Sequence, residues 1–522
     1  MVELICRPLA LVGAAVVLAA CGGPQPDTSA GLSGESPRLA AAMELPDNAV
    51  ADAVANLDGI IEELMTSSGI PGMAVAVVEG DKTLYARGFG VRDTNSGERV
   101  NADTVFQLAS LSKPLAATVA AREVGAGTIS WDTAIVDELP WFALADPAAT
   151  RMLDVGDLFA HRSGLPDHAG DLLEDLGYDR RTILERLRLL PLGQFRTSYA
   201  YNNFGVTAAA EAVAAAAGVP WADLSEQVLY RPLGMASASS RFADYQARPN
   251  RAIGHIRVDG DHQPRYVRDP DEQSPAGGVS ASVTDLTHWL KMILADGSHN
   301  GTQIIDPKAL LPALTPQIVS GPPTEPAMRA GFYGYGFNVS TSAAGRVQLS
   351  HSGAFLLGAA TNFVIIPSAD VAIVVLTNAT PSGVPETLTA EFADLVEFGR
   401  VQRDWRTLYA GAFAGMTTPF GELAGQQPPA DPTPAQPLSA YLGTYANAYW
   451  GPARVTEQDG ALTLALGPGG SAYQLGHWDG DIFTFALDSE NAPPGSISKA
   501  SFDGDRLTLE YFDTDRMGTF LR

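Results

Sequence analysis

Ser110-Leu-Ser-Lys113 begins a predicted helix, because the apolar run Leu115–Val124 follows it. Pro114 would fall in the first turn of this helix, where a missing backbone N–H costs little. Ser110 and Lys113 are three residues apart and would therefore share one helix face. A serine at this position also meets the positive end of the helix dipole, which favours an oxyanion.

The chemistry expected from this stretch is nucleophilic attack by Ser110. A serine hydroxyl is a poor nucleophile until a neighbouring base takes its proton. Lys113 can be that base if its pKa falls from the reference value near 10.4 to about 7, which burial or a nearby cation can achieve. The pattern alone is not decisive, because Ser-x-x-Lys recurs at Ser496–Lys499 among predicted strands.

A second motif, Tyr201-Asn-Asn203, precedes the Ala-rich helix predicted over Thr207–Ala217. We expect Tyr201 to carry a second proton and the Asn203 amide to donate a hydrogen bond to the substrate. The alternative is a loop tyrosine whose hydroxyl has an ordinary partner. The same spacing recurs at Tyr445–Asn447, outside the region that carries Ser110.

A third motif, His351-Ser352-Gly353, follows the alternating strand predicted over Arg346–Ser350. A strand edge with a glycine lets a substrate backbone lie close and pair with it. Ala354 would supply one backbone N–H to an oxyanion, and Ser110 would supply the other. The alternative is a simple turn at a strand end. The His-x-Gly spacing recurs at His168–Gly170 and His299–Gly301.

The body of the chain has the pattern of an α+β fold. Apolar residues at helical spacing over Asp47–Ser68 predict an amphipathic helix, and Gly72–Val78 is typical of a buried strand. Helices fill the middle of the chain. Further strands are predicted over residues 83–88, 346–350, 360–366 and 371–377. We expect the strands from both ends of this region to join one antiparallel sheet.

The last part of the chain follows a different pattern. Residues 425–437 contain five prolines, which predict a stiff, exposed linker. Beyond it, short alternating runs are separated by a strong hairpin signal, at Asp459-Gly460, Asp479-Gly480 and Asp503-Gly504. We therefore expect a connecting segment over residues 401–437 and a small β-barrel or β-meander domain over residues 438–522.

The first residues have the pattern of an export signal. Leu9–Ala20 is a run of 12 apolar residues, too short to span a bilayer but typical of a signal peptide. It ends in Cys21, which resembles the lipidated cysteine of a bacterial lipoprotein. The alternative is a hydrophobic tail with a chance cysteine. Residues 1–21 are predicted to be the signal and residues 22–46 a flexible tether, so the protein would be exported and anchored to the membrane of the cell envelope by lipid.

Composition excludes several functions. The formal charge of −25 and the pI near 4.6 argue against a nucleic-acid partner, since phosphate backbones are bound by Lys and Arg. Cys6 and Cys21 are the only cysteines, so the body of the chain can hold neither a thiolate metal site nor a cysteine nucleophile. The eight histidines form no zinc-hydrolase motif, and we expect no metal and no cofactor.

Residues 55–400 resemble the serine β-lactamase and penicillin-binding protein superfamily, in its class C, D-alanyl-D-alanine carboxypeptidase and esterase branch. Beside the three motifs, the resemblance rests on five stretches: Ile70–Val77, Phe106–Ser110, His161–Pro166, Tyr230–Met235 and Pro275–Ser280. It implies a β-lactamase/transpeptidase-like fold for a hydrolase domain over residues 47–400. The tail after residue 438 resembles the small β domain of some members.

The resemblance also implies roles for the motif residues. Ser110 would be acylated, and Lys113 and Tyr201 would act as acid and base. The substrate would be a small molecule or peptide with a carbonyl centre. It would contact residues of the second and third motifs: Asn203, His351, Ser352, Gly353 and Ala354.

One position departs from dedicated class C β-lactamases, which carry Lys-Thr-Gly where this chain has His351-Ser-Gly353. A lysine is a permanent cation suited to a carboxylate, whereas a histidine is mostly neutral at neutral pH. The first hypothesis is therefore a serine hydrolase of envelope D-residue peptides or small esters. A β-lactamase is the second. A penicillin-binding envelope sensor without turnover is a third, of another class, and the complete Ser, Lys, Tyr, Asn and His set argues against it.

Overall fold

The computed structural model describes residues 36, 39, 41 and 43–522. The predicted signal peptide and Cys21 lie outside these residues. Residues Ala42–Arg522 form one compact unit. Within the described residues, no single helix has the length and apolar character needed to cross a membrane. One bent pair, Asn203–Ala217 with Trp221–Leu233, meets that test by length and composition only.

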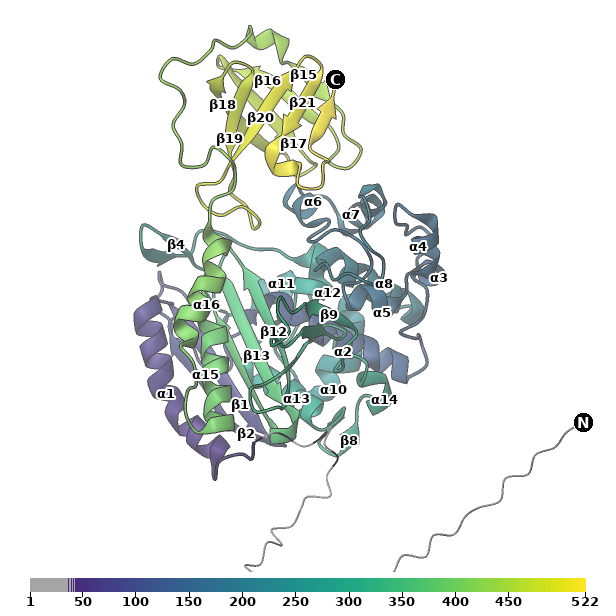
Figure 1. Ribbon diagram of the computed structural model, residues 1–522, viewed down its shortest axis with the longest axis vertical. Coiled ribbons are helices and arrows are strands. Elements are labelled where there is room, and N and C mark those ends of the chain that lie inside the picture. Colours follow the sequence, from purple (N-terminus) through teal and green to yellow (C-terminus); the bar gives the residue numbers. More distant parts are fainter. Residues whose placement is uncertain (1–35, 37–38, 40, 42) are drawn as a thin grey trace, which may run out of the picture. The chain divides into compact units, whose positions relative to one another are not determined.

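An eight-stranded antiparallel sheet forms the centre of the first 400 residues (Figure 1). Its strand order is β2-β1-β14-β13-β12-β11-β10-β9, so the early hairpin pairs with strands from the end of this region, as predicted. The bounds are β1 (Gly72–Glu79), β2 (Lys82–Gly90), β9 (Ile318–Gly321), β10 (Gly331–Tyr333), β11 (Asn338–Thr341), β12 (Val347–Phe355), β13 (Ala359–Ile366) and β14 (Val371–Thr377).

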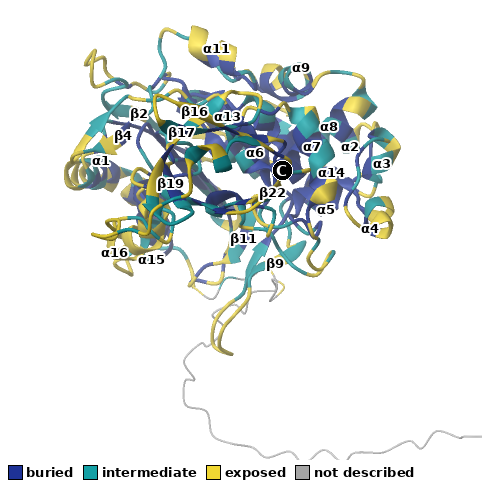
Figure 2. Cartoon of the chain, turned by 90° about the horizontal axis from the view of Figure 1, so that it is seen from above, coloured by how far each residue is buried: buried dark blue, intermediate teal, exposed yellow. Residues whose placement is uncertain are grey.

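Helices cover both faces of this sheet, because its central strands are apolar on both sides. Val75 and Val77 of β1 pack with α1 (Ala49–Ser68) and α15 (Val384–Phe398). Ala74 and Ala76, which alternate with them, belong to the larger core that includes α2 (Ser112–Gly125) and α13 (Val283–Leu294). Figure 2 shows the sheet strands largely buried, whereas α1 has many exposed residues on its outer side.

The middle of the chain is helical, as predicted, and packs against the α2 side of the sheet. The predicted helix over Thr207–Ala217 is confirmed and begins four residues earlier, at Asn203. The helices of this region are α3 (Ile135–Glu138), α4 (Pro147–Met152), α5 (Val155–Phe159), α6 (Asp171–Asp175), α7 (Arg180–Arg186), α8 (Asn203–Ala217), α9 (Trp221–Ser225), α10 (Arg231–Leu233), α11 (Phe242–Ala247), α12 (Ser274–Gly277) and α14 (Pro307–Leu310). Three two-stranded ribbons complete it: β3 (Phe106–Gln107) with β6 (Ser280–Ala281), β4 (Ile256–Val258) with β5 (Asp261–Gln263), and β7 (Ser298–His299) with β8 (Thr302–Gln303).

The C-terminal β-rich region is a nearly closed antiparallel barrel of eight strands in sequential order. A bridge between Ala446 and Leu521 joins the two ends of its sheet. Its strands are β15 (Gly443–Tyr445), β16 (Ala453–Gln458), β17 (Ala461–Leu466), β18 (Ser471–Asp479), β19 (Ile482–Ala486), β20 (Ile497–Asp503), β21 (Arg506–Leu509) and β22 (Thr519–Leu521). The three predicted Asp-Gly hairpins connect β16 to β17, β18 to β19, and β20 to β21.

The proline-rich segment is irregular, as expected, but it is not a free spacer. The Thr433 amide donates to the Asp479 carboxylate over 2.6 Å, and Gln436 donates to Asp481 over 3.0 Å. Its second half therefore lies along the β18–β19 hairpin. The segment before it contains α16 (Trp405–Phe413), which packs on α15.

Candidate active site

Ser110 lies in the short 3-10 turn Ala109–Leu111, which leads directly into the predicted helix α2. Ala109 is fully buried and has a φ of 48°, a left-handed conformation that alanine rarely adopts. Such strain persists only where the surroundings enforce it. The Ser112 hydroxyl helps to do so, because it donates to the Ala109 carbonyl over 2.7 Å and accepts from the Val279 amide over 2.9 Å.

Lys113 is completely buried, and its hydrogen-bond acceptors among the described residues are all uncharged. Its Nζ donates to Ser110 Oγ over 3.0 Å, to the Asn203 Oδ1 over 2.6 Å and to the Ala276 carbonyl over 3.0 Å. Burial without a contacting carboxylate lowers the pKa of Lys113 to about 7, although the more distant Asp171 opposes the shift. A large fraction of Lys113 is therefore uncharged at neutral pH and able to accept a proton.

Tyr201 approaches the same serine oxygen from the loop before α8. Its hydroxyl donates to Ser110 Oγ over 2.7 Å, and its ring lies 4.5 Å from Lys113 Nζ. Burial raises the pKa of Tyr201 well above its ordinary value. The phenol therefore stays protonated, so Lys113 is the better base and Tyr201 the better proton donor.

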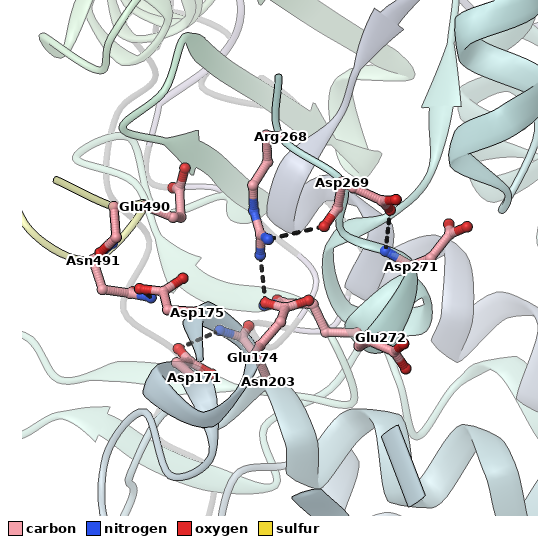
Figure 3. Close-up of polar contacts among 12 residues, drawn as sticks. Asp171, Glu174, Asp175, Asn203, Arg268, Asp269, Asp271, Glu272, Glu490 and Asn491 are labelled. Atoms are coloured by element: carbon pink, nitrogen blue, oxygen red, sulfur yellow. Dashed lines mark hydrogen bonds and ion pairs between the residues drawn. The ribbon is translucent and has the colours of Figure 1, made fainter. Parts of the chain in front are cut away.

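Asn203 connects Lys113 to an acidic group that the motifs did not indicate. As the first residue of α8, it accepts from Lys113 and donates from Nδ2 to Asp171 Oδ2 over 2.8 Å (Figure 3). His168 Nδ1 lies 2.8 Å from the same carboxylate oxygen. One amide hydrogen of Asn203 is therefore bound to Asp171. The substrate contact that we predicted would use the other amide hydrogen.

His351 lies inside β12, which continues past the predicted end at Ser350 to Phe355. Nδ1 donates to the Ser352 carbonyl over 2.7 Å, so Nε2 accepts from the Tyr333 hydroxyl over 2.9 Å. Burial, followed by the charge of Lys113, lowers the pKa of His351 to about 3. His351 is therefore a neutral ring with both nitrogens occupied, and it supplies no cation at the position of the β-lactamase lysine.

Gly353 brings the backbone of β12 against Ser110. A Cβ at this position would overlap the Leu108 carbonyl and the Thr361 hydroxyl, and it would lie 3.1 Å from the Ser110 backbone nitrogen. Only glycine permits this approach. Ala354 follows in the same strand and is paired with Ala360 of β13.

Ser352 lies on the opposite face of β12 from these groups. Its hydroxyl accepts from Asn362 Nδ2 over 2.9 Å, and Asn362 accepts in turn from Thr389 of α15 over 2.7 Å. The side chain therefore faces α15. A contact between Ser352 and a substrate at Ser110 would therefore use the backbone of Ser352 and not its side chain.

The repeated motifs elsewhere in the chain form no comparable site. The Ser496 hydroxyl donates to the Pro493 carbonyl, whereas Lys499 pairs with Glu422 at 2.5 Å. Tyr445 is buried in the barrel and donates to the Tyr441 carbonyl. His168, which begins another copy of the His-x-Gly spacing, does lie near the site. The centroid of its ring is 5.5 Å from that of Tyr201.

Several residues around the site belong to none of the three motifs. His161 is buried, with its ring centroid 4.6 Å from that of Tyr201, and its Nδ1 accepts from the Asn202 amide. Asp171 and the Ala276 carbonyl likewise belong to no spacing motif. His161 and Ala276 lie within the stretches His161–Pro166 and Pro275–Ser280, on which the resemblance rests. Asp171 lies in neither stretch. Within the described residues, no group of His, Cys, Asp or Glu side chains is arranged to hold a metal ion.

A loop of the barrel reaches the same region of the hydrolase domain. Glu490 accepts from the Leu356 and Leu357 amides over 2.7 and 3.3 Å, directly after β12. Asn491 donates to Asp175 of α6 over 2.9 Å, close to Asp171 (Figure 3). Burial raises the pKa of Glu490 to about 8. The barrel therefore contacts both α6 and the end of β12.

Arg268 is the buried cation of this interface. It donates to Glu174 over 2.5 Å, and its guanidinium lies 5.2 Å from the ring centroid of Phe355. Its side chain is 9% exposed. Burial raises the pKa of Glu174 to about 7 in spite of this ion pair.

Comparison with known proteins agrees with this geometry. The profile of the family described as Beta-lactamase matches residues 57–398, and that of a domain of unknown function (DUF3471) matches residues 427–518. Penicillin-binding protein 4 of Amycolatopsis lactamdurans is 30% identical over 400 residues, which cover 74% of this chain and 95% of that protein. Unguisins hydrolase ungD of Aspergillus violaceofuscus is 25% identical over 490 residues, 84% of each chain.

A solved structure shares the fold. The octameric penicillin-binding protein homologue from Pyrococcus abyssi superimposes with a TM-score of 0.59 at 18% identity, covering 90% of this chain and 100% of that one. The match to the family profile spans most of the chain, and it includes all three motifs. This chain therefore belongs to the β-lactamase family, within the superfamily of serine β-lactamases and penicillin-binding proteins.

Proposed function

We propose that the protein is a serine hydrolase that cleaves an amide or ester through a covalent acyl-enzyme on Ser110. One observation carries the proposal: Ser110 Oγ accepts hydrogen bonds from Lys113 Nζ over 3.0 Å and from the Tyr201 hydroxyl over 2.7 Å. The lowered pKa of Lys113 and the retained proton of Tyr201 give the two groups complementary tasks.

The proposed reaction follows from these states. Uncharged Lys113 takes the Ser110 proton while Oγ bonds to the substrate carbonyl carbon. The carbonyl electrons move onto its oxygen, which the backbone N–H groups of Ser110 and Ala354 would stabilise. When the bond to the leaving group breaks, Tyr201 gives that group a proton, and the proton held by Lys113 restores the phenol. Water then attacks the acyl ester by the same route and frees Ser110.

The environment of His351 favours small esters, or bonds of envelope D-residue peptides without an adjacent free carboxylate, over β-lactams. A neutral ring whose nitrogens are both occupied offers no fixed cation for an antibiotic carboxylate. The family profile makes a β-lactamase the second candidate. A penicillin-binding sensor without turnover is the candidate of another class.

Labelling with a fluorescent penicillin and release of p-nitrophenol from its acetate and butyrate esters test the proposal. Ser110→Ala should abolish both signals. Ser496→Ala is the matched control, since it alters the second Ser-x-x-Lys copy, and it should keep both signals. Labelling or ester release that persists without Ser110 would refute the acyl-enzyme. Fast loss of label with lactam opening would favour the β-lactamase, and a stable label without any ester release would favour the sensor.

We also propose that the protein is exported and anchored to the cell envelope through a lipid on Cys21. The apolar run Leu9–Ala20 before this cysteine supports the proposal. Growth of the producing cells with a labelled fatty acid should label the protein, and Cys21→Ala should remove the label. Equal labelling of the two proteins would exclude this anchor.

A further inference from the structure

A second cavity lies on the face of β12 that points away from Ser110. Its volume is about 460 Å³, and it lies between strands β11–β13 and helices α15 and α16. The side chains of Ser350 and Ser352 line it, whereas His351 and Gly353 alternate with them and face the catalytic side. The two sites are therefore separated by the thickness of one strand.

The sheet surface in this cavity is unusual because it is polar beneath a helix. The row Val75, Val375, Asn362 and Ser352 crosses four paired strands on this face. Its first two members belong to the apolar core under α1 and α15, and its last two line the cavity. A sheet face covered by helices is normally apolar. This polar end thus has the composition of a binding site, not of a packed layer.

Glu386 of α15 adds an unmatched acid to this wall. The residue is 4% exposed and lines the cavity, and no group among the described residues lies in good hydrogen-bond geometry to either carboxyl oxygen. Burial raises the pKa of Glu386 to about 7, while its own backbone N–H and the nearby Ser352 hydroxyl oppose this rise. A buried carboxyl without a partner normally lowers the stability of the folded protein. A ligand that donates hydrogen bonds to this carboxyl would remove that cost.

The other acids of the cavity already have partners in the described part of the chain. Asp394 accepts from the Gln402 amide over 2.8 Å and from the Trp405 indole over 2.6 Å. Glu397 accepts from the Ser342 hydroxyl over 2.7 Å. Glu386 is therefore the group left to receive a donor.

We propose that this cavity binds a small primary amine in its ammonium form, with Glu386 as its counter-ion. An ammonium group brings three N–H donors, which match the Glu386 oxygens and the hydroxyls of Ser350 and Ser352. Trp405 and Tyr409 of α16, stacked at 5.8 Å, contribute aromatic surface to the cavity. Such walls favour a cation with an apolar or aromatic body.

The size and the charge distribution of the cavity agree with this ligand class. Its volume falls in the range of small-molecule sites, about 300–1,000 Å³. Its two arginines, Arg329 and Arg403, are exposed, whereas Glu386 is buried. The buried end of the cavity is therefore acidic, and the ammonium group would enter first.

Isothermal titration of the purified full chain with 2-phenylethylamine tests the site, with 2-phenylethanol as the neutral analogue. We expect the amine to bind at least about tenfold more tightly than the alcohol. Glu386→Gln keeps the side-chain size and should weaken amine binding at least about tenfold. Glu63→Gln removes an exposed carboxylate of α1 outside the cavity and should leave binding unchanged.

A cavity-filling variant, Ala390→Leu, separates the site from a general charge effect, because Ala390 lines the cavity and Glu386 is kept. It should also abolish amine binding, while circular dichroism verifies that each variant is folded. The proposal is overturned if the amine does not bind in the millimolar range. It is equally overturned if amine and alcohol bind alike, or if Glu386→Gln or the folded Ala390→Leu protein binds as the unmodified protein does.

Discussion

The buried ionisable groups on the two faces of β12 differ in their hydrogen bonding. On the Ser110 face, Lys113 is fully buried and all three of its hydrogen-bond positions are occupied by uncharged oxygens. On the α15 face, Glu386 is almost as deeply buried, and no group in the described part of the chain lies in good hydrogen-bond geometry to its carboxyl oxygens. Burial shifts both pKa values toward neutrality, to about 7. Buried groups with shifted pKa values cluster at functional sites, and the two proposals above assign proton transfer to Lys113 and ligand binding to Glu386.

The largest effect should come from removing the base on the catalytic face. Lys113→Met should lower Ser110-dependent ester hydrolysis by about 10²–10⁴-fold, the usual contribution of general acid–base catalysis. Steady-state kinetics with p-nitrophenyl butyrate measure it. Lys308→Met, which changes an exposed lysine of α14, is the control and should keep the rate. A Lys113→Met protein with full activity would remove Lys113 from the mechanism.

The pH dependence of the rate should follow the same lysine. A lysine with a pKa lowered to about 7 is charged and inactive below that pH and becomes a base above it. Ester hydrolysis at low substrate should therefore rise about 50-fold from pH 5 to pH 7 and about twofold more above pH 7 before it levels off. His351, with a pKa of about 3, stays neutral throughout and contributes no step near pH 6.5. A profile that is flat over this range would contradict the assignment.

On the other face, Glu386→Gln should stabilise the protein in a pH-dependent way. The folded-state pKa of Glu386 lies above its ordinary value, so the folded protein holds a proton that the unfolded chain releases between pH 4.5 and 7. Stability is therefore lost as pH rises through this window. The substitution should gain up to about 3 kcal/mol at pH 8 and almost nothing at pH 4. Urea denaturation at the two pH values measures the difference, and an equal effect at both would contradict a buried, unpaired carboxyl.

The smallest effects on stability should come from two substitutions in β12, each of which changes a single methyl or hydroxyl group on one face of the strand. Gly353→Ala places a Cβ against the Leu108 carbonyl, so it should cost about 1–3 kcal/mol and displace β12 from Ser110. Ser352→Ala removes one hydrogen bond to Asn362 and should cost about 1 kcal/mol. Thermal melting and ester hydrolysis should show loss of activity for Gly353→Ala only. A similar loss in both variants would mean that the faces are not independent.

The sequence was a good guide wherever a short pattern coincided with a regular element. The helix after Ser110, the early hairpin and the Asp-Gly turns of the barrel follow from local periodicity and turn chemistry, and the structure confirms them. The convergence of Ser110, Lys113 and Tyr201 was expected from motif order and resemblance. The structure places these side chains within hydrogen-bond distance.

Features that depend on tertiary packing had no such signal. The Ala276 carbonyl and Asp171 reach the site from α12 and α6, and no residue spacing links them to Lys113. The end of β12 was predicted too early, because His351 and Ser352 interrupt the apolar alternation, whereas pairing with β13 extends the strand to Phe355. The cavity at Glu386 also could not be predicted, since an acid in a helix looks the same whether or not it has a partner.

The contact between Glu490 and the end of β12 has a consequence for unfolding. If the barrel separated, the Leu356 and Leu357 amides would lose their acceptor, and Arg268 would lose one of the acids that surround it. Separation would break these hydrogen bonds and would expose apolar surface of the core cluster to which residues of both parts belong. The hydrolase domain and the barrel should therefore melt in one cooperative transition, despite having separate hydrogen-bonded sheets.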